Sequence, residues 1–398
     1  MNDDIWKAIE SRNYWGSRPD TGIPRELVEK EWDLMQGAEP VYFYGPRRAG
    51  KTTACLQILD RLAKKDGKTS CLYVNFEEPA FPTAPGPEFI SEAIEGHARA
   101  HGEAPKYVFL DEVQNVLGWE KWVRSAADKK TPKVFVTGSS AKLLSSEFAT
   151  TLGGRGLGFL VLPFSWAEFR KAIPHADFGD FLQTGGYPAV ALEKNAGKRV
   201  RLLEEYFETA ISRDIAARYS VRDVPSLRAL AVWVLTNSAK PLSYNTIRSL
   251  TGLSFDAIRL YLSYLEDAFL AFQVPSFSYS LKQAMEKPRK YYAYDTGLAA
   301  AVSKSFSPDW GRKAENAVAI ELVRRRYEPQ YHKNGADVDF VVKDGLALSG
   351  INVCWEEKAP ARENGSLAEF VKVHKGARTL LLAGKKGIAD WVGKTNRL

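Results

Sequence analysis

The segment GPRRAGKT at residues 45–52 constrains the fold of this chain more than any other feature. It matches the pattern G-x-x-x-x-G-K-[ST] in full, follows the apolar segment VYFY (41–44) and precedes the helical pattern TTACLQILDRLAKK (52–65). The glycines permit a tight turn whose N–H groups point at phosphate oxygens, and the helix N-terminus adds partial positive charge there. We therefore expect a strand, a phosphate-binding loop and a helix.

Two side chains of this loop have specific expected roles. Lys51 is expected to meet the β- and γ-phosphates of ATP, and Thr52 to offer its hydroxyl to Mg²⁺. The alternative is a bare glycine-rich loop, which the flanking strand and helix disfavour. The predicted nucleotide-binding residues here are Gly45, Pro46, Arg47, Arg48, Ala49, Gly50, Lys51, Thr52 and Thr53.

The first 163 residues alternate short apolar runs with helical stretches. This alternation is typical of an α/β fold with a parallel sheet that is covered on both faces. The expected strands are VYFY (41–44), SCLYVNF (70–76), KYVFLD (106–111), KVFVTG (133–138) and GFLVLP (158–163).

Two acids follow the third of these strands. Asp111 is expected to hold the Mg²⁺ shell and the adjacent Glu112 to polarise the attacking water. Strands often end in solvated acids, but here the pair follows the phosphate loop by a whole strand-and-helix unit. The next strand ends in VTGSS, where Thr137, Ser139 or Ser140 would sense the γ-phosphate; a simple turn is an equal alternative.

Arg155 lies in the glycine-rich segment TTLGGRGLGF (150–159). An arginine there can act as a finger that stabilises the transition-state charge of a nucleotide held by a neighbouring subunit of a homo-oligomer. A surface arginine in a flexible loop is the alternative, and it is favoured unless the protein assembles. The expected catalytic residues are thus Lys51, Glu112 and Arg155.

The rest of the chain divides by its patterns. Residues 1–163 form the expected nucleotide-binding core, and residues 164–223 are helical, as a lid would be. Residues 224–300 contain two amphipathic segments around TGLS, then strand, loop and strand, which is typical of a winged helix-turn-helix. Residues 301–398 run helix, three strands, helix, strand.

Composition limits the class of protein. The net charge of +7 suits DNA or another polyanion, although a well-solvated surface explains it equally well. Three cysteines without paired spacing favour a reducing compartment and no zinc site. The acidic N-terminal segment does not resemble a signal peptide, and no apolar run approaches the roughly 18 residues of a membrane span. We expect a cytoplasmic protein without membrane contact.

Several segments together resemble a known family, the prokaryotic AAA+/STAND-like P-loop ATPases with a C-terminal domain of unknown function. The resemblance spans nearly the whole chain and implies an ASCE-type ATPase core, a helical lid, a winged helix and a terminal module similar to the PD-(D/E)xK nuclease fold. In GGYPAV, Pro188 matches the G-x-P element by which such lids touch the nucleotide; a helix-capping turn is the alternative. The segments are YGPRRAGKTT, LDEVQNVLGWEKWVRSAAD, VTGSSAKLLSSE, GGRG, LPFSWAEF, GGYPAV and ISRDI.

The family also suggests DNA binding, for which the residues give less support. The expected recognition helix, SFDAIRLYLSYLEDAF (254–269), has Arg259 as its one base among three acids, so base reading is not favoured. A better phosphate contact is the segment KQAMEKPRKYY (282–292), although a solvated loop is a serious alternative. Its relevant residues are Lys282, Lys287, Arg289, Lys290, Tyr291 and Tyr292.

The terminal module lacks part of the nuclease pattern. Glu315 and Asp339 match the family's acids, but Asn352 and Cys354 stand where a second acid and a lysine are expected. An amide is a poorer ligand for a hard metal than a carboxylate, and a thiol cannot supply a positive charge. A register slip that recruits the acids at 356–357 is disfavoured, because it would move apolar residues out of the core pattern. We expect a degenerate nuclease fold.

Three hypotheses follow. The first is a Mg²⁺-dependent ATPase that couples ATP binding and hydrolysis to binding of duplex or branched DNA. The second is a nucleotide-gated scaffold or signalling switch that has a protein partner and turns over rarely. The third is an active Mg²⁺-dependent nuclease.

Overall fold

The computed structural model describes residues 2–138, 154–303, 309–333, 335–345 and 347–394. The chain separates into two compact units, Met1–Leu162 and Pro163–Leu398. The finer division into 164–223, 224–300 and 301–398 stays a prediction. Within the described ranges, no helix combines the length and apolar character needed to cross a membrane.

The first unit is built on a five-stranded sheet in which every neighbouring pair is parallel. The order is β2-β3-β4-β1-β5, so β4 separates β1, which precedes the phosphate loop, from β3, which carries the acid pair. All five predicted strands are confirmed. Their bounds are β1 Val41–Tyr44, β2 Cys71–Asn75, β3 Tyr107–Asp111, β4 Lys133–Thr137 and β5 Leu157–Leu160.

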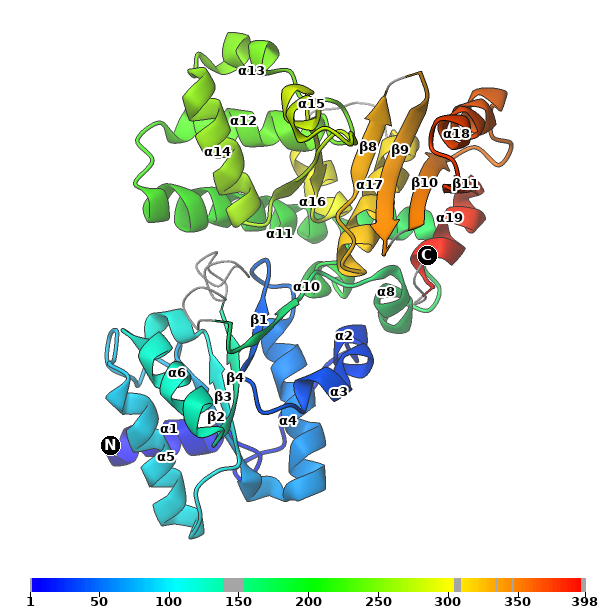
Figure 1. Cartoon of the computed structure of the whole chain (residues 1–398). Helices are drawn as coiled ribbons and strands as arrows, with labels where there is room; N and C mark the ends of the chain where they lie inside the picture. Colours follow the sequence, from blue (N-terminus) through cyan, green and yellow to red (C-terminus); the bar gives the residue numbers. More distant parts are fainter. Residues whose placement is uncertain (1, 139–153, 304–308, 334, 346, 395–398) are drawn as a thin grey trace. The chain divides into compact units, whose positions relative to one another are not determined.

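Helices cover both faces of this sheet because side chains alternate along each strand. On β3, Val108 and Leu110 pack with residues of α1, α5 and α6, while Phe109 packs on the other face with residues of α2, α3 and α4. Figure 1 shows α4 and α5 on opposite sides of the sheet. The helices are α1 Asp3–Ser11, α2 Glu26–Lys30, α3 Trp32–Met35, α4 Lys51–Asp66, α5 Glu88–His101 and α6 Trp119–Lys129.

The second unit begins with helices and one short hairpin. The hydroxyl of Ser165 and the carboxylate of Asp177 start α8 and α9 with capping boxes, in which side chain and backbone satisfy each other's N–H groups. Strands β6 and β7 pair antiparallel. The elements are α8 Trp166–Ala172, α9 Phe178–Thr184, α10 Pro188–Ala191, α11 Ala196–Thr209, a π-helical segment Ala210–Ala217, α12 Val224–Thr236, α13 Tyr244–Thr251, α14 Phe255–Asp267, β6 Ala271–Val274, α15 Leu281–Glu286, β7 Lys290–Ala293 and α16 Thr296–Val302.

The chain ends in a four-stranded sheet with helices (Figure 1). The strand order is β11-β10-β9-β8, with β10 and β11 parallel and the other pairs antiparallel. The predicted order of one helix, three strands, a helix and a strand is confirmed, and a last helix, α19, was not predicted. The elements are α17 Trp310–Arg324, β8 Gln330–Lys333, β9 Asp337–Asp344, β10 Ala347–Cys354, α18 Ala361–Val373, β11 Arg378–Ala383 and α19 Gly384–Val392.

Candidate nucleotide-binding site

The phosphate loop joins β1 to α4 and needs glycine at both of its ends. Gly45 has φ +139°, and a Cβ there would lie 2.3 Å from the carbonyl oxygen of Val161. Gly50 has φ +94°, in the left-handed region, and caps α4. An L-residue at either position would be strained, because its Cβ disfavours positive φ. Both glycines of the motif are therefore set by backbone geometry.

The ammonium group of Lys51 lies over this loop. Its Nζ donates to the carbonyl oxygens of Gly45, at 3.1 Å, and Pro46, at 2.9 Å, and the side chain is buried. The other loop residues differ in exposure: Arg47 is half-buried, Arg48 is exposed with φ +62°, and the remainder are buried or half-buried. The arrangement concentrates positive charge where a helix N-terminus begins.

Arg25, which no sequence pattern singled out, holds the loop through hydrogen bonds to backbone carbonyl groups. Its side chain is buried, and its guanidinium donates to the carbonyl oxygens of Ala49, at 2.6 Å, and Leu162, at 2.7 Å. Its backbone N–H donates to the side-chain oxygen of Gln57 on α4, at 2.9 Å. Arg25 thus ties the loop to the last residue of the first unit.

Asp111 is almost fully buried and receives three hydroxyl hydrogen bonds. Thr52 Oγ1 lies 2.9 Å from Asp111 Oδ2, the Tyr73 hydroxyl donates to the same oxygen at 2.6 Å, and Thr137 donates to Oδ1. Burial raises the pKa of Asp111 above its ordinary value, while the hydrogen bonds from Thr137, Tyr73 and Thr52 lower it in part. The site therefore favours a cation beside this carboxylate.

Glu112 follows at the end of β3 in a left-handed conformation, with φ +54° and ψ +47°. Its N–H donates to Thr137 Oγ1 at 3.1 Å, and its carboxylate accepts a hydrogen bond from the side chain of Gln114. A non-glycine residue with positive φ is uncommon, and such strain concentrates at functional sites. Thr137, one of three candidate γ-phosphate sensors, contacts both acids of the pair, and its role as a sensor stays a prediction.

The residues present fit a magnesium ion that is shared with a nucleotide. Thr52 and Asp111 offer a hydroxyl and a carboxylate side by side. Among the described residues, no cluster of three or more His, Cys, Asp and Glu side chains could hold a metal unaided. Mg²⁺ typically binds through one or two protein oxygens together with substrate phosphates, which is what this pair allows.

Comparison with known families agrees with this geometry. A family model described as an AAA domain matches residues 38–170, and a second, a domain of unknown function (DUF8612), matches residues 175–309. The uncharacterized protein MJ1544 of Methanocaldococcus jannaschii is 32% identical over 338 residues, which cover 79% of this chain and 74% of that protein. This chain belongs to the same family and is a P-loop ATPase of the AAA type.

Two further comparisons are more distant. An uncharacterized protein of Haemophilus influenzae is 27% identical over 356 residues, covering 86% of this chain and 88% of its own length. The structure of AMPPCP-bound DnaA from Aquifex aeolicus is 12% identical with a TM-score of 0.31, and it covers 64% of this chain and 91% of that one. At that TM-score the likeness carries no argument about function.

The structure does not test the roles of three predicted site residues of the ATPase. Arg155 Nε lies 3.2 Å from the Asp128 carboxylate, in an ion pair whose two side chains are about half exposed. Pro188 begins α10 in the second unit. Ser139, like Ser140, lies outside the described residues. The roles of Arg155, Pro188 and Ser139 stay predictions.

The two acids of the terminal module share a lysine from β7. Lys290 Nζ lies 3.0 Å from Glu315 Oε1 and 3.9 Å from Asp339 Oδ1. The Tyr292 hydroxyl donates to the same Glu315 oxygen at 2.6 Å. Burial lowers the pKa of Lys290, but Glu315 and Asp339 raise it more, so it lies above its ordinary value. Lys290 thus places one cation beside Glu315 and Asp339.

This arrangement corrects one expectation. Lys290, Tyr291 and Tyr292 were expected as phosphate contacts on a loop, but they are 7%, 4% and 0% exposed. They lie on β7, which pairs with β6 and contacts α17. Buried side chains cannot reach a nucleic acid, so that prediction is wrong for these three residues. The sequence did not reveal this burial, because a lysine beside two tyrosines fits a buried strand as well as a nucleic-acid-binding surface.

Asn352 and Cys354, at the two positions where the nuclease pattern has an acid and a lysine, also make hydrogen bonds within the module. Asn352 Oδ1 accepts from the N–H of Asp339 at 3.1 Å, and Asn352 Nδ2 donates to Glu363 of α18 at 2.8 Å. Cys354 Sγ donates to Glu356 at 3.0 Å. Asn352 therefore links β9, β10 and α18, which is a structural use of the position.

Proposed function

We propose that this chain binds Mg·ATP at the loop of residues 45–52 and hydrolyses it. The contact between Thr52 and Asp111 carries the proposal, because it unites the two expected magnesium ligands next to Lys51. Lys51 would hold the β- and γ-phosphates, and Glu112 would orient the attacking water. Bound magnesium would supply charge neutralisation on the phosphate oxygens.

Calorimetry with Mg·ATP and a turnover assay test the proposal. We expect heat of binding and phosphate release that both require the divalent ion. A well-folded sample that shows neither would remove the basis for every role assigned above.

For the output of the ATPase, we propose that residues 224–300 act as a winged helix that binds a macromolecule. Helices α12 to α14, followed by the β6–β7 hairpin, have the required order of elements. DNA is the first candidate, supported by the net charge of +7 and by exposed bases such as Arg248, Arg259 and Lys282. Turnover with and without duplex, forked and four-way DNA, together with a low-salt gel shift, tests this candidate.

A protein partner is the second candidate, and a specific observation favours it. Large apolar side chains of this segment are exposed in addition to Tyr279, although such residues normally pack in a core. Their exposures are Leu250 63%, Phe255 41%, Leu260 49% and Met285 65%. If the partner is a protein, the chain is a nucleotide-gated switch. We then expect that DNA does not stimulate turnover and that the chain does not shift DNA in a gel.

We propose that the terminal module is a nuclease-like fold without nuclease activity. Lys290 pairs with Glu315 and lies near Asp339, so these side chains are engaged within the fold, which supports a binding or assembly role. The competing hypothesis, an active nuclease, predicts Mg²⁺-dependent cutting of DNA that survives Lys51→Ala and disappears with Asp339→Ala. Absence of cutting by the wild-type chain would exclude it.

A further inference from the structure

A groove of about 990 Å³ opens between two helices and the hairpin of residues 224–300. One side is formed by α13 and α14, and the other by the end of α15 and the start of β7; Figure 1 shows these elements together. Its volume is at the upper end for ligand sites, which suits a segment of a macromolecule better than a small molecule. The lining residues used below are Tyr244, Phe255, Arg259, Met285, Lys287 and Arg289.

Two cations of this groove are available for a partner. Arg259 on α14 and Lys287 after α15 make no hydrogen bond or ion pair with any residue that the structure describes. Arg289 donates to the side chain of Gln273 and stays at the groove wall. A guanidinium and an ammonium group that lack carboxylate partners are suited to recognise carboxylates of a bound chain.

The charge of the groove is too small for a nucleic acid. Arg259, Lys287 and Arg289 face two acids of the lining, Glu266 and Glu286, which leaves a formal excess of one positive charge. A nucleic acid brings one phosphate charge per nucleotide, and its binding depends on many basic contacts. Burial raises the pKa of Glu266 to about 7, so its charge is only partly expressed at neutral pH. The net positive charge of the groove therefore matches a ligand that brings one or two carboxylates.

Apolar and aromatic side chains line the same groove. Phe255, 41% exposed, and Met285, 65% exposed, belong to its lining, and Tyr244 lies next to Phe255 with 6.4 Å between ring centres. Aromatic residues, methionine and arginine are the types enriched at the centres of protein interfaces.

We infer that this groove docks an acidic peptide segment of a protein partner, with a large apolar side chain against Phe255 and Met285 and carboxylates against Arg259 and Lys287. The inference rests on the second candidate of the proposed function and names the chemistry of its partner. Duplex DNA and single-stranded DNA are the competing occupants.

A peptide library displayed on phage tests the inference. Random 12-residue peptides are selected on the immobilised full-length chain, and recovered peptides are labelled and measured by fluorescence anisotropy. We expect enrichment of peptides that combine Asp or Glu with Leu, Phe or Trp. Arg259→Glu and Lys287→Glu should each weaken their binding about tenfold or more, because each reverses the charge at a contact. Phe255→Ala should weaken it without a change of charge.

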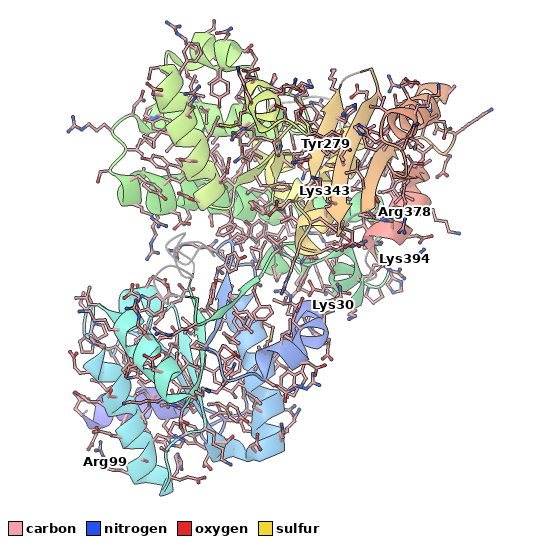
Figure 2. All side chains as sticks on the ribbon, viewed as in Figure 1. Lys30, Arg99, Tyr279, Lys343, Arg378 and Lys394 are labelled. Atoms are coloured by element: carbon pink, nitrogen blue, oxygen red, sulfur yellow. The ribbon has the colours of Figure 1, made fainter. Side chains whose placement is uncertain are left out.

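The matched control is Arg99→Glu, which reverses an exposed charge on α5 of the first unit (Figure 2). It should leave peptide binding unchanged, and near-ultraviolet circular dichroism of each variant shows whether it is folded. A 20-base-pair duplex and a 20-nucleotide strand are measured in parallel.

Three outcomes of the peptide experiment overturn the inference: no enrichment, enrichment of basic peptides, or peptide binding that Arg259→Glu and Lys287→Glu leave unchanged. Binding of DNA alone that both substitutions abolish overturns it in favour of a nucleic-acid site. ATP turnover is measured on the same samples. Turnover without peptide binding refutes the groove assignment alone, whereas peptide binding without turnover refutes the proposed hydrolysis alone and agrees with a switch that turns over rarely.

Discussion

At the scale of single residues, the acid pair after β3 depends on partners that the sequence does not reveal. Asp111 and Glu112 were predicted from their place after an apolar strand. The hydroxyl of Tyr73 donates to Asp111, but Tyr73 lies on the apolar strand β2, whose sequence predicts only core side chains. A hydrogen bond between neighbouring strands depends on their order in the sheet, and the order β2-β3 is a tertiary property.

Substitutions at Lys51 and Glu112 separate binding from hydrolysis. Lys51→Ala should abolish Mg·ATP binding, because it removes the cation that meets the phosphates. Glu112→Gln should keep binding and lower kcat by about 10²- to 10⁴-fold, the usual contribution of a positioned base. Calorimetry and steady-state turnover measure the two effects, and equal loss of binding in both variants would contradict the role given to Glu112.

Removal of the Tyr73 hydroxyl should change the pH dependence of turnover. Its hydrogen bond lowers the pKa of Asp111 against the larger effect of burial. In Tyr73→Phe the pKa of Asp111 therefore rises further, and protons compete with Mg²⁺ up to a higher pH. We expect the acid limb of kcat/KM to move to higher pH, and added Mg²⁺ should reverse part of the loss. An unshifted limb would show that Asp111 titration does not limit the reaction.

At the scale of elements, the phosphate loop is positioned by a residue outside its motif. Arg25→Gln should raise KM for ATP more than it lowers kcat, because the loop backbone loses the hydrogen bond at Ala49 and its tie to Leu162, while Lys51 and the acid pair remain. Arg18→Gln is the control, since Arg18 is 66% exposed and pairs only weakly with Asp60 at 3.6 Å. A larger effect on kcat than on KM would indicate that Arg25 acts on the chemical step.

Local patterns predicted most elements because those elements depend on local chemistry. The strands of the first sheet alternate their faces, and caps such as Ser254 mark helix starts. The π-helical segment Ala210–Ala217 was predicted as ordinary helix, since its sequence has the same apolar spacing. Lys290 was misjudged because its burial depends on α17 and β9, which lie far along the chain.

At the scale of the whole molecule, each unit has its own core, and the second unit also contains a partly buried ionic cluster of Lys290, Glu315 and Asp339. Burial raises the pKa of Asp339 well above its ordinary value, Glu315 adds to the rise, and Lys290 opposes it. A buried ion pair contributes little net stability against an apolar replacement, whereas loss of one partner leaves an unpaired buried charge. A substitution in this cluster should therefore destabilise the second unit and leave the first unit unchanged.

Lys290→Met should destabilise the second unit by up to about 3–5 kcal/mol, because it leaves two partly buried carboxylates without their cation. The loss of stability should grow as pH rises. The folded-state pKa of Asp339 is raised, so at low pH this carboxyl is neutral and does not need the cation. Once Asp339 ionises at higher pH, its charge is left without a partner in the variant. Adding Glu315→Gln should restore part of the stability, and Lys282→Met, at an exposed lysine, should be neutral. Urea unfolding followed at several pH values, with Mg·ATP binding as the readout of the first unit, measures these effects. If ATP binding fell in parallel with the stability of the second unit, the two cores would not be independent, and the buried cluster would serve the ATPase as a whole.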